Sequence, residues 1–206
     1  MELSFERIYL HISKTDTYNR AELGENMKEL YKKFTELDIN TSLINLDKPG
    51  EYYPYYCYPL NAQPIGYEGC IMYCFVEGYG ETVFASNPEN YSDEGQNYPL
   101  AENFTDFIRL ILACGSVNPA EQIVWMGKEM FEDAIKSIKD NMTKEQENVL
   151  AVLAEEFRLT AMENPYEYVK NLQKDFDYSK LQYSDEYYDT LGITKPQLFA
   201  EIKIEL

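Results

Sequence analysis

The feature that most constrains the fold is a pair of apolar runs followed closely by an amphipathic helix. Residues 69–77 (GCIMYCFVE) form a β-prone run that ends at the turn sequence Gly-Tyr-Gly of residues 78–80. A second run follows at residues 81–86 (ETVFAS). Two such runs joined by a glycine turn predict an antiparallel hairpin.

Residues 101–115 (AENFTDFIRLILACG) predict a helix that covers this hairpin. Asn103 can cap its first turn, and Gly115 can adopt the left-handed conformation that ends many helices. The apolar residues recur at i, i+3, i+4, i+7 and i+8, on one helical face. They are Phe104, Phe107, Ile108, Ile111 and Leu112. We therefore expect an α+β fold in which a core helix lies across a sheet.

The sequence before the hairpin predicts mixed structure. Residues 5–13 alternate between apolar and polar side chains as a strand does, and residues 15–37 carry a helical apolar stripe. Residues 41–47 form a short β-like run. Three prolines in residues 51–64 favour an extended loop or an edge strand. Residues 87–99 are typical of a polar connection between the hairpin and the helix.

The sequence after Gly115 is mainly helical. Helices are expected over residues 128–140, after the capping-box sequence of residues 143–146, and after Asn164-Pro165. Residues 178–192 are polar and rich in tyrosine, and residues 194–206 predict a closing helix or strand. We expect a single domain overall, with an α+β core at residues 1–117 and a helical C-terminal extension at residues 118–206 packed on it.

The net charge restricts the possible partners. The chain has 18 Lys and Arg against 36 Asp and Glu, which gives a formal net charge of −18. Nucleic acids and anionic membranes both require a positive protein surface, so neither is expected as a ligand. A cationic protein would instead be attracted at long range. The alternative is an acidic surface that only keeps the chain soluble.

Cysteine and histidine usage argues against a metal site. The four cysteines are expected to be reduced and mostly buried, and with His11 alone they make a poor set of ligands. No apolar run approaches the ~20 residues that span a bilayer. The first residues carry an acid where a signal peptide has bases. We therefore expect a cytoplasmic protein without a metal or cofactor.

The distribution of charge is more informative than its total. Residues 49–108 contain no Lys or Arg, but they hold nine acids and ten of the 19 tyrosines. Tyrosine is enriched at protein interfaces because it offers rigid contact area and a hydroxyl at low entropic cost. The alternative is that these tyrosines pack in the core or on the sheet. The predicted contact residues are Tyr52, Tyr53, Tyr55, Tyr56, Glu77, Tyr79, Glu81, Glu89, Asp93 and Glu94. A second tyrosine–acid cluster at residues 163–189 is a possible contributor.

Residues 65–193 resemble the SUKH superfamily of bacterial immunity proteins. The resemblance is carried by the apolar strand pair after Gly69 and by the helix that begins Ala-Glu-Asn-Phe-Thr-Asp-Phe at residues 101–107. The sequences at residues 112–115, 121–125, 164–168 and 184–188, together with Phe131, are similar to a subgroup with a longer helical C-terminus. The N-terminus diverges from the family pattern.

The resemblance implies an α+β domain that binds and neutralises a toxin protein, often a nuclease or a deaminase, by blocking its active face. The acidic charge of the chain leads us to expect that this toxin is basic. It implies no catalytic residues. Two other functions stay open from the residues themselves. One is an enzyme that uses carboxylates such as Glu81, or Asp175 with Asp177, for acid–base work or Mg²⁺ binding. The other is a regulatory or scaffolding protein without a toxin partner. The oligomeric state is not predicted.

Overall fold

The computed structural model describes residues 29–50, 54–90 and 95–195. The chain divides into two compact units, Met1–Asp38 and Ile39–Leu206. In the first unit only helix α3 (Glu29–Glu36) is described, and the rings of Tyr31 and Phe34 stack within it at 6.5 Å. This helix is the described part of the helix predicted at residues 15–37. The strand predicted at residues 5–13 lies outside the described residues.

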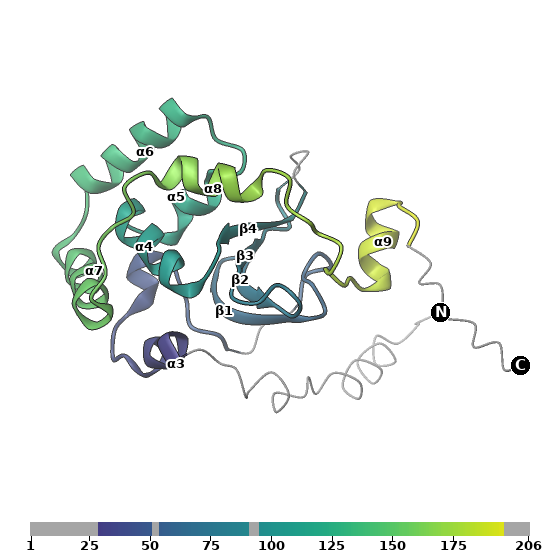
Figure 1. Cartoon of the computed structure of the whole chain (residues 1–206), viewed down its shortest axis with the longest axis horizontal. Coiled ribbons are helices and arrows are strands. Elements are labelled where there is room, and N and C mark those ends of the chain that lie inside the picture. The colour runs from purple at the N-terminus through teal and green to yellow at the C-terminus, as the bar shows by residue number, and fades with distance from the viewer. Residues whose placement is uncertain (1–28, 51–53, 91–94, 196–206) are drawn as a thin grey trace, which may run out of the picture. The chain divides into compact units, whose positions relative to one another are not determined.

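The second unit combines a four-stranded sheet with helices, as predicted for an α+β fold. In Figure 1 its strands lie between the group of helices α4 to α7 and the separate helix α9. Its elements, in chain order, are η2 (Thr41–Ile44), β1 (Ala62–Glu68), β2 (Ile71–Val76), β3 (Val83–Ser86), β4 (Asn97–Ala101), α4 (Phe104–Cys114), α5 (Val117–Gln122), α6 (Lys128–Asp140), α7 (Lys144–Phe157), α8 (Pro165–Gln173) and α9 (Asp185–Leu191).

The sheet is antiparallel throughout, in the order β1-β2-β3-β4. The predicted hairpin is confirmed, with Met72 opposite Ser86 and Phe75 opposite Val83. Because successive side chains of a strand point to opposite sides, β2 supplies Tyr73 to one side of the sheet and Cys74 to the other.

Each edge of the sheet has features that hinder pairing with an additional strand. In β1 the register shifts between Pro64 and Gly66, and Asp47 forms a bridge to Tyr67 on the outer edge. A side chain at Gly66 would lie 2.6 Å from Leu46 Cδ1, so glycine permits this close approach. On the other edge, helix α8 packs on β4, and Gln173 Nε2 donates to the carbonyl of Pro99 at 3.2 Å. Prolines and covered backbone are common protections of sheet edges.

Helix α4 lies across the Tyr73 side of the sheet, as the sequence predicts. The side chain of Asn103 accepts from Asp106 N at 2.9 Å, and Gly115 has φ 83°. Both predicted caps are therefore confirmed. The ring of Phe107 packs 5.9 Å from that of Tyr73, and Phe104 packs 6.1 Å from Phe75.

The remaining helices pack on α4 and β4. Helix α7 begins with the predicted capping box between Thr143 and Gln146. Gln146 Nε2 also donates to Leu43 O at 3.0 Å, which ties α7 to η2. Helix α8 begins at the predicted position, but Asn164 makes no side-chain cap hydrogen bond. No helix in the described ranges has the length and apolar character needed to cross a membrane.

Two expectations differ from the structure. The β-like run at 41–47 is mostly η2, because the Asn40 side chain accepts from Ser42 N and caps a helical turn. The polar connection at 87–99 ends in β4, a fully buried strand. The extended loop or edge strand expected at 51–64 agrees with the structure at its end, where the edge strand β1 begins at Ala62. The tyrosine-rich stretch 178–192, for which the sequence predicts no element, contains α9. Most of the element predicted at 194–206 lies outside the described residues.

Candidate interaction surface

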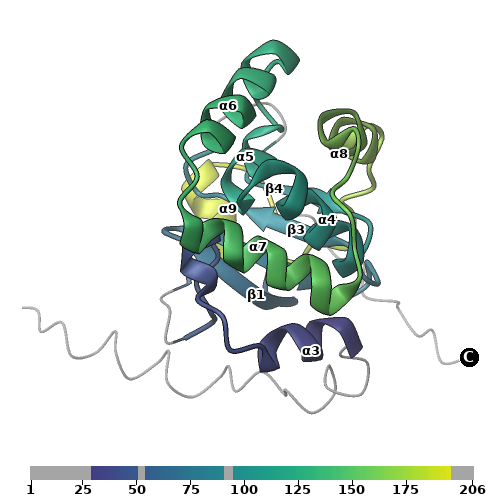
Figure 2. The same cartoon turned by 90° about the vertical axis from the view of Figure 1, so that its left-hand side faces the viewer.

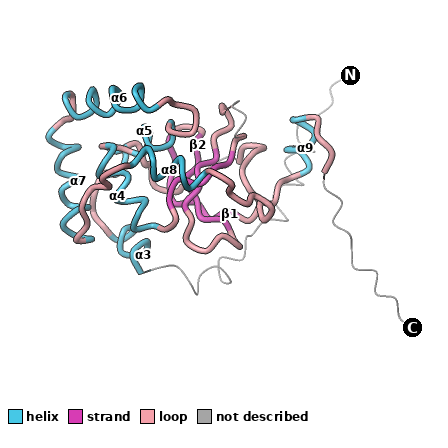
Figure 3. The backbone as a smooth tube through the Cα atoms, turned by 45° about the horizontal axis from the view of Figure 1, so that its top comes forward, coloured by secondary structure: helices cyan, strands magenta, loops and turns pink. Residues whose placement is uncertain are grey.

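One side of the sheet is covered mostly by irregular chain. Alternate residues of β2 from Met72 to Val76 point to this side, together with Phe84 of β3. The segments that cover it are residues 54–61, the β2–β3 turn at 77–81, and residues 176–193. Figure 3 draws the connection from α8 to α9 largely as loop. We call the outer surface of these three segments the tyrosine face.

Asn61 holds the three segments of the tyrosine face together. Its Nδ2 donates to Glu77 O at 3.0 Å and to Lys180 O at 3.1 Å, and its Oδ1 accepts from Gln182 N at 3.2 Å. The side chain is buried, at 6% exposure. Leu60 N adds a bond to Gln182 O at 2.7 Å. One buried amide thus joins residues more than 100 positions apart in the sequence.

Aromatic rings connect the segments further. Tyr183 and Tyr187 stack at 3.8 Å, and Tyr187 also lies 6.3 Å from Tyr56. In the turn, the ring of Tyr79 lies 5.5 Å from that of Phe176 and accepts a hydrogen bond at its hydroxyl from Lys180 N. Burial is the first cause of the raised pKa of both Tyr79 and Tyr187. These rings are therefore packed from one side and partly open to solvent on the other.

Apolar side chains emerge from the tyrosine face into solvent. Of the six large hydrophobic residues that are exposed among the described residues, four belong to it: Tyr55, Leu60, Leu191 and Ile193. Exposures of 38–49% at these four positions are high for such side chains. Apolar groups gathered on a surface commonly mark a binding site.

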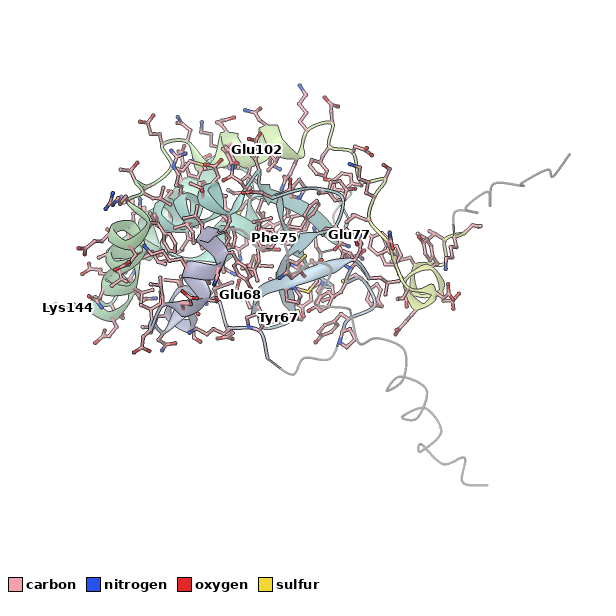
Figure 4. All side chains as sticks on the ribbon, turned by 60° about the horizontal axis from the view of Figure 1, so that its bottom comes forward. Tyr67, Glu68, Phe75, Glu77, Glu102 and Lys144 are labelled. Carbon is pink, nitrogen blue, oxygen red and sulfur yellow. The ribbon has the colours of Figure 1, made fainter. Side chains whose placement is uncertain are left out.

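The same segments also carry exposed carboxylates. Glu77 and Glu81 are exposed in the turn, and α9 carries exposed Asp185, Glu186 and Asp189. Figure 4 shows Glu77 nearer to α9 than Glu68 is. Asp177 is also exposed, and its pKa is lowered because the backbone N–H of Ser179 donates to it. It is thus stabilised as an anion.

The structure brings together half of the predicted contact residues. Tyr55, Tyr56, Glu77, Tyr79 and Glu81 all lie on the tyrosine face. Glu89 does not join them, because it follows β3 at the opposite end of the strands, beside Cys70. The other four predicted residues, Tyr52, Tyr53, Asp93 and Glu94, lie outside the described residues.

The predicted contact residues do not include Asn61, Tyr183 or Tyr187. Tyr183 precedes α9 and Tyr187 lies within it, and both belong to the second tyrosine–acid cluster at residues 163–189, whose composition is the signal for them. Asn61 offers no such signal, because its partners are Glu77, Lys180 and Gln182 from distant segments.

A second polar cluster lies on the Tyr73 side of the sheet, which we call the helical side because α4 covers it. Glu121 of α5 is 2% exposed and accepts from Asn87 Nδ2 at 2.7 Å and from the hydroxyl of Tyr98. Nearby, Glu68 accepts from the hydroxyl of Tyr73 at 2.9 Å. Burial is the first cause of the raised pKa of both carboxyls. Carboxyls with raised pKa are candidates for acid–base chemistry. The hydrogen bonds of Glu121 also attach α5 to the sheet.

A groove opens between α6 and the start of α8, two helices that stand apart in Figure 2. Its volume is about 310 Å³, and its apolar lining includes Phe131, Ile135 and Met162. Across the rim, Lys128 pairs with Glu167 at 2.9 Å. The volume lies at the lower end of the range for small-molecule sites.

The carboxylates considered for catalysis from sequence are all exposed. Glu81 lies in the turn, and Asp175 and Asp177 follow α8. Within the described residues, no three His, Cys, Asp or Glu side chains are grouped as metal ligands. All four cysteines are free thiols, and burial raises the pKa of Cys74 to about 12.

Comparisons with protein-family models, with curated proteins and with solved structures gave no match for this chain.

Proposed function

We propose that this chain is a non-catalytic, acidic protein-binding module and that the tyrosine face is its contact surface. The observation that carries the proposal is the convergence of three distant segments, held by Asn61, into one aromatic surface that exposes apolar side chains. Half-buried tyrosines offer contact area that is already ordered, so binding costs little side-chain entropy.

The partner that fits this surface is a basic protein. The segments of the tyrosine face carry exposed carboxylates at Glu77, Glu81 and Asp185, and the whole chain carries a net charge of −18. Complementary charge accelerates association and determines orientation. Because β1 is irregular at its outer edge and α8 packs on β4, we expect the partner to meet side chains and not to extend the sheet.

The resemblance to SUKH immunity proteins gives this proposal its most specific form. The chain would neutralise a nuclease- or deaminase-type toxin by masking its active face. Carboxylates of the tyrosine face would occupy the positions where the toxin binds substrate phosphates. The toxin need only have a basic active face for this mode of binding.

The first test is to capture the partner. The tagged chain is purified from its native cells at low and at high salt, and the proteins that accompany it are identified by mass spectrometry. The proposal predicts one basic protein, or the C-terminal domain of a large secreted one, in near-equal amount. Its loss at high salt would show that charge carries the association, because salt screens exposed charges beyond about 10 Å at 0.1 M. Retention of no specific protein at either salt would contradict the proposal.

Charge reversal then locates the surface. Glu77→Lys with Glu81→Lys is expected to slow association with the captured partner and to flatten its salt dependence. Glu145→Lys with Glu155→Lys is the control, because both residues are exposed on α7 and the two variants have the same net charge. Equal association rates for the two variants would mean that the tyrosine face is not the contact surface.

A carboxylate enzyme is the second candidate, favoured only by the raised pKa of the neighbouring carboxyls Glu68 and Glu121. Calorimetry with Mg²⁺ and Mn²⁺ separates the two functions. Micromolar binding that is lost in both Glu68→Gln and Glu121→Gln would favour the enzyme over the binding module.

A further inference from the structure

The tyrosine face contains a cation site that the chain itself occupies. Lys195 Nζ lies 2.5 Å from Asp185 Oδ1 and 5.8 Å from the centre of the Tyr188 ring. Asp185 and Tyr188 are three residues apart in α9, so their side chains share one side of the helix. A carboxylate beside an aromatic ring attracts a cation through two separate interactions.

Lys195 is held weakly in this site. The side chains of Lys195 and Asp185 are 55% and 81% exposed, and exposed ion pairs contribute little to stability. Hydrogen bonding to Asp185 raises the pKa of Lys195, so the amine stays charged. Another cation of similar geometry can therefore replace it at little cost.

Lys180 provides an internal comparison on the same face. Its Nζ lies 5.5 Å from the Tyr79 ring and donates to Gly78 O at 2.8 Å. Its backbone N–H also donates to Tyr79, and its carbonyl accepts from Asn61. Lys180 is thus fixed through both backbone and side chain, whereas the contacts of Lys195 recorded among the described residues are made by its side chain.

The surroundings of the site fit a partner side chain. Glu186 and Asp189 are exposed on the same helix, which carries three acids and no base in its sequence DEYYDTL. The exposed apolar residues Leu191 and Ile193 follow directly. A bound cation would lose more water beneath a docked protein than Lys195 loses now, and desolvation strengthens both ion pairing and cation–π attraction.

We propose that Asp185 and Tyr188 bind an arginine or lysine side chain of the partner and that Lys195 is the internal occupant which this side chain displaces. This inference rests on the proposed function and names the chemistry that the tyrosine face recognises. It makes Lys195 a competitor of the partner, so its removal should strengthen binding.

A defined peptide tests the site without the natural partner. The probe is a fluorescein-labelled peptide of six Arg-Gly repeats, and the same peptide with citrulline in place of arginine is the neutral control. Affinity is measured by fluorescence anisotropy at 20 and at 150 mM NaCl. We expect the arginine peptide to bind and the citrulline peptide not to bind.

Two matched pairs of variants assign the binding to this site. Lys195→Gln should increase affinity by about two- to fivefold, the equilibrium equivalent of losing an exposed ion pair. Lys136→Gln, which removes an exposed base from α6, should not. Asp185→Asn should weaken binding more than Asp189→Asn does, although both remove one charge from α9. Tyr188→Leu should also weaken binding, because it keeps apolar bulk and removes the ring's negative face.

Equal effects within each pair would overturn the inference, since net charge alone would then account for binding. Failure of the arginine peptide to bind the wild-type chain at either salt would overturn it as well. Neither result affects the proposed function, which depends on capture of a basic protein and on Glu77 and Glu81. Conversely, failure of the capture with intact peptide binding would reject the proposed function alone.

Discussion

The two sides of the sheet are covered by different kinds of structure. On the helical side, Tyr73 lies under Phe107 of α4, and both are fully buried at 0% exposure. On the other side, Tyr56, Tyr79 and Tyr187 pack on the sheet core but keep part of each ring in solvent. Regular helices cover the first side, and mostly irregular segments cover the second.

This difference suggests one role for each side of the sheet, namely fold stability for one and, as proposed, partner binding for the other. All of the contact area of a fully buried ring is used within the folded protein, and removal of the ring leaves a cavity. A half-buried ring is ordered by the fold and still has area for a partner, as interface tyrosines do. On the proposed function, the helical side acts as the scaffold and the tyrosine face supplies the contact surface.

The largest expected effect concerns the helical side. Phe107→Ala should lower the free energy of unfolding by about 3–5 kcal/mol, because it removes a buried ring between α4 and the sheet. Tyr187→Ala on the tyrosine face should cost less than half as much. Urea unfolding measures the two losses of stability, and the comparison holds when the two variants have equal m-values. Equal losses would mean that the two sides contribute alike to stability.

An intermediate effect is expected at the amide that organises the tyrosine face. Asn61→Ala should cost about 1–3 kcal/mol, because three hydrogen bonds from one side chain to the backbone of Glu77, Lys180 and Gln182 are lost together. Hydrogen exchange should accelerate at residues 180–182 and remain unchanged in α4. Asn141→Ala is the control, since it loses one exposed bond to Ser137. Acceleration in α4 as well would show that the two sides are one cooperative unit.

The smallest effect concerns pH. Burial raises the pKa of Glu121 in the folded state, so its stabilising contribution is present below its ordinary value of 4.5 and is lost as pH rises through the raised pKa. Glu121→Gln removes this ionisation. The variant should therefore gain stability relative to the wild type between pH 4 and pH 8.

Urea unfolding across this pH range tests the Glu121 prediction. Glu155→Gln controls for the loss of one exposed charge. A stability difference between Glu121→Gln and the wild type that does not vary with pH would contradict it. Tyr98 and Asn87, which both donate to Glu121, remain in place.

Local patterns predicted the helical side well. The hairpin, both caps of α4 and the capping box of α7 depend on residues close in sequence, so their signals are readable without the fold. Strand β4 was missed because Pro99 and its polar neighbours are typical of loops, and only pairing with β3 and cover by α8 make it a strand. At 41–44, the cap by Asn40 outweighed β-branched residues.

The tyrosine face could be predicted only in part. The base-free run indicated Tyr55, Tyr56 and Tyr79, because composition alone distinguishes that segment. The contribution of α9 depends on contacts such as that between Tyr56 and Tyr187, which join distant positions. No local pattern encodes such long-range contacts.

The central claim is that the partner binds the tyrosine face and not the helical side. Hydrogen exchange of the chain, free and bound to the captured protein, tests it most directly. The account predicts protection at residues 54–61, 77–81 and 176–193, with no change in α4 and α7. Protection confined to α6 and the start of α8, where the groove opens, would contradict it.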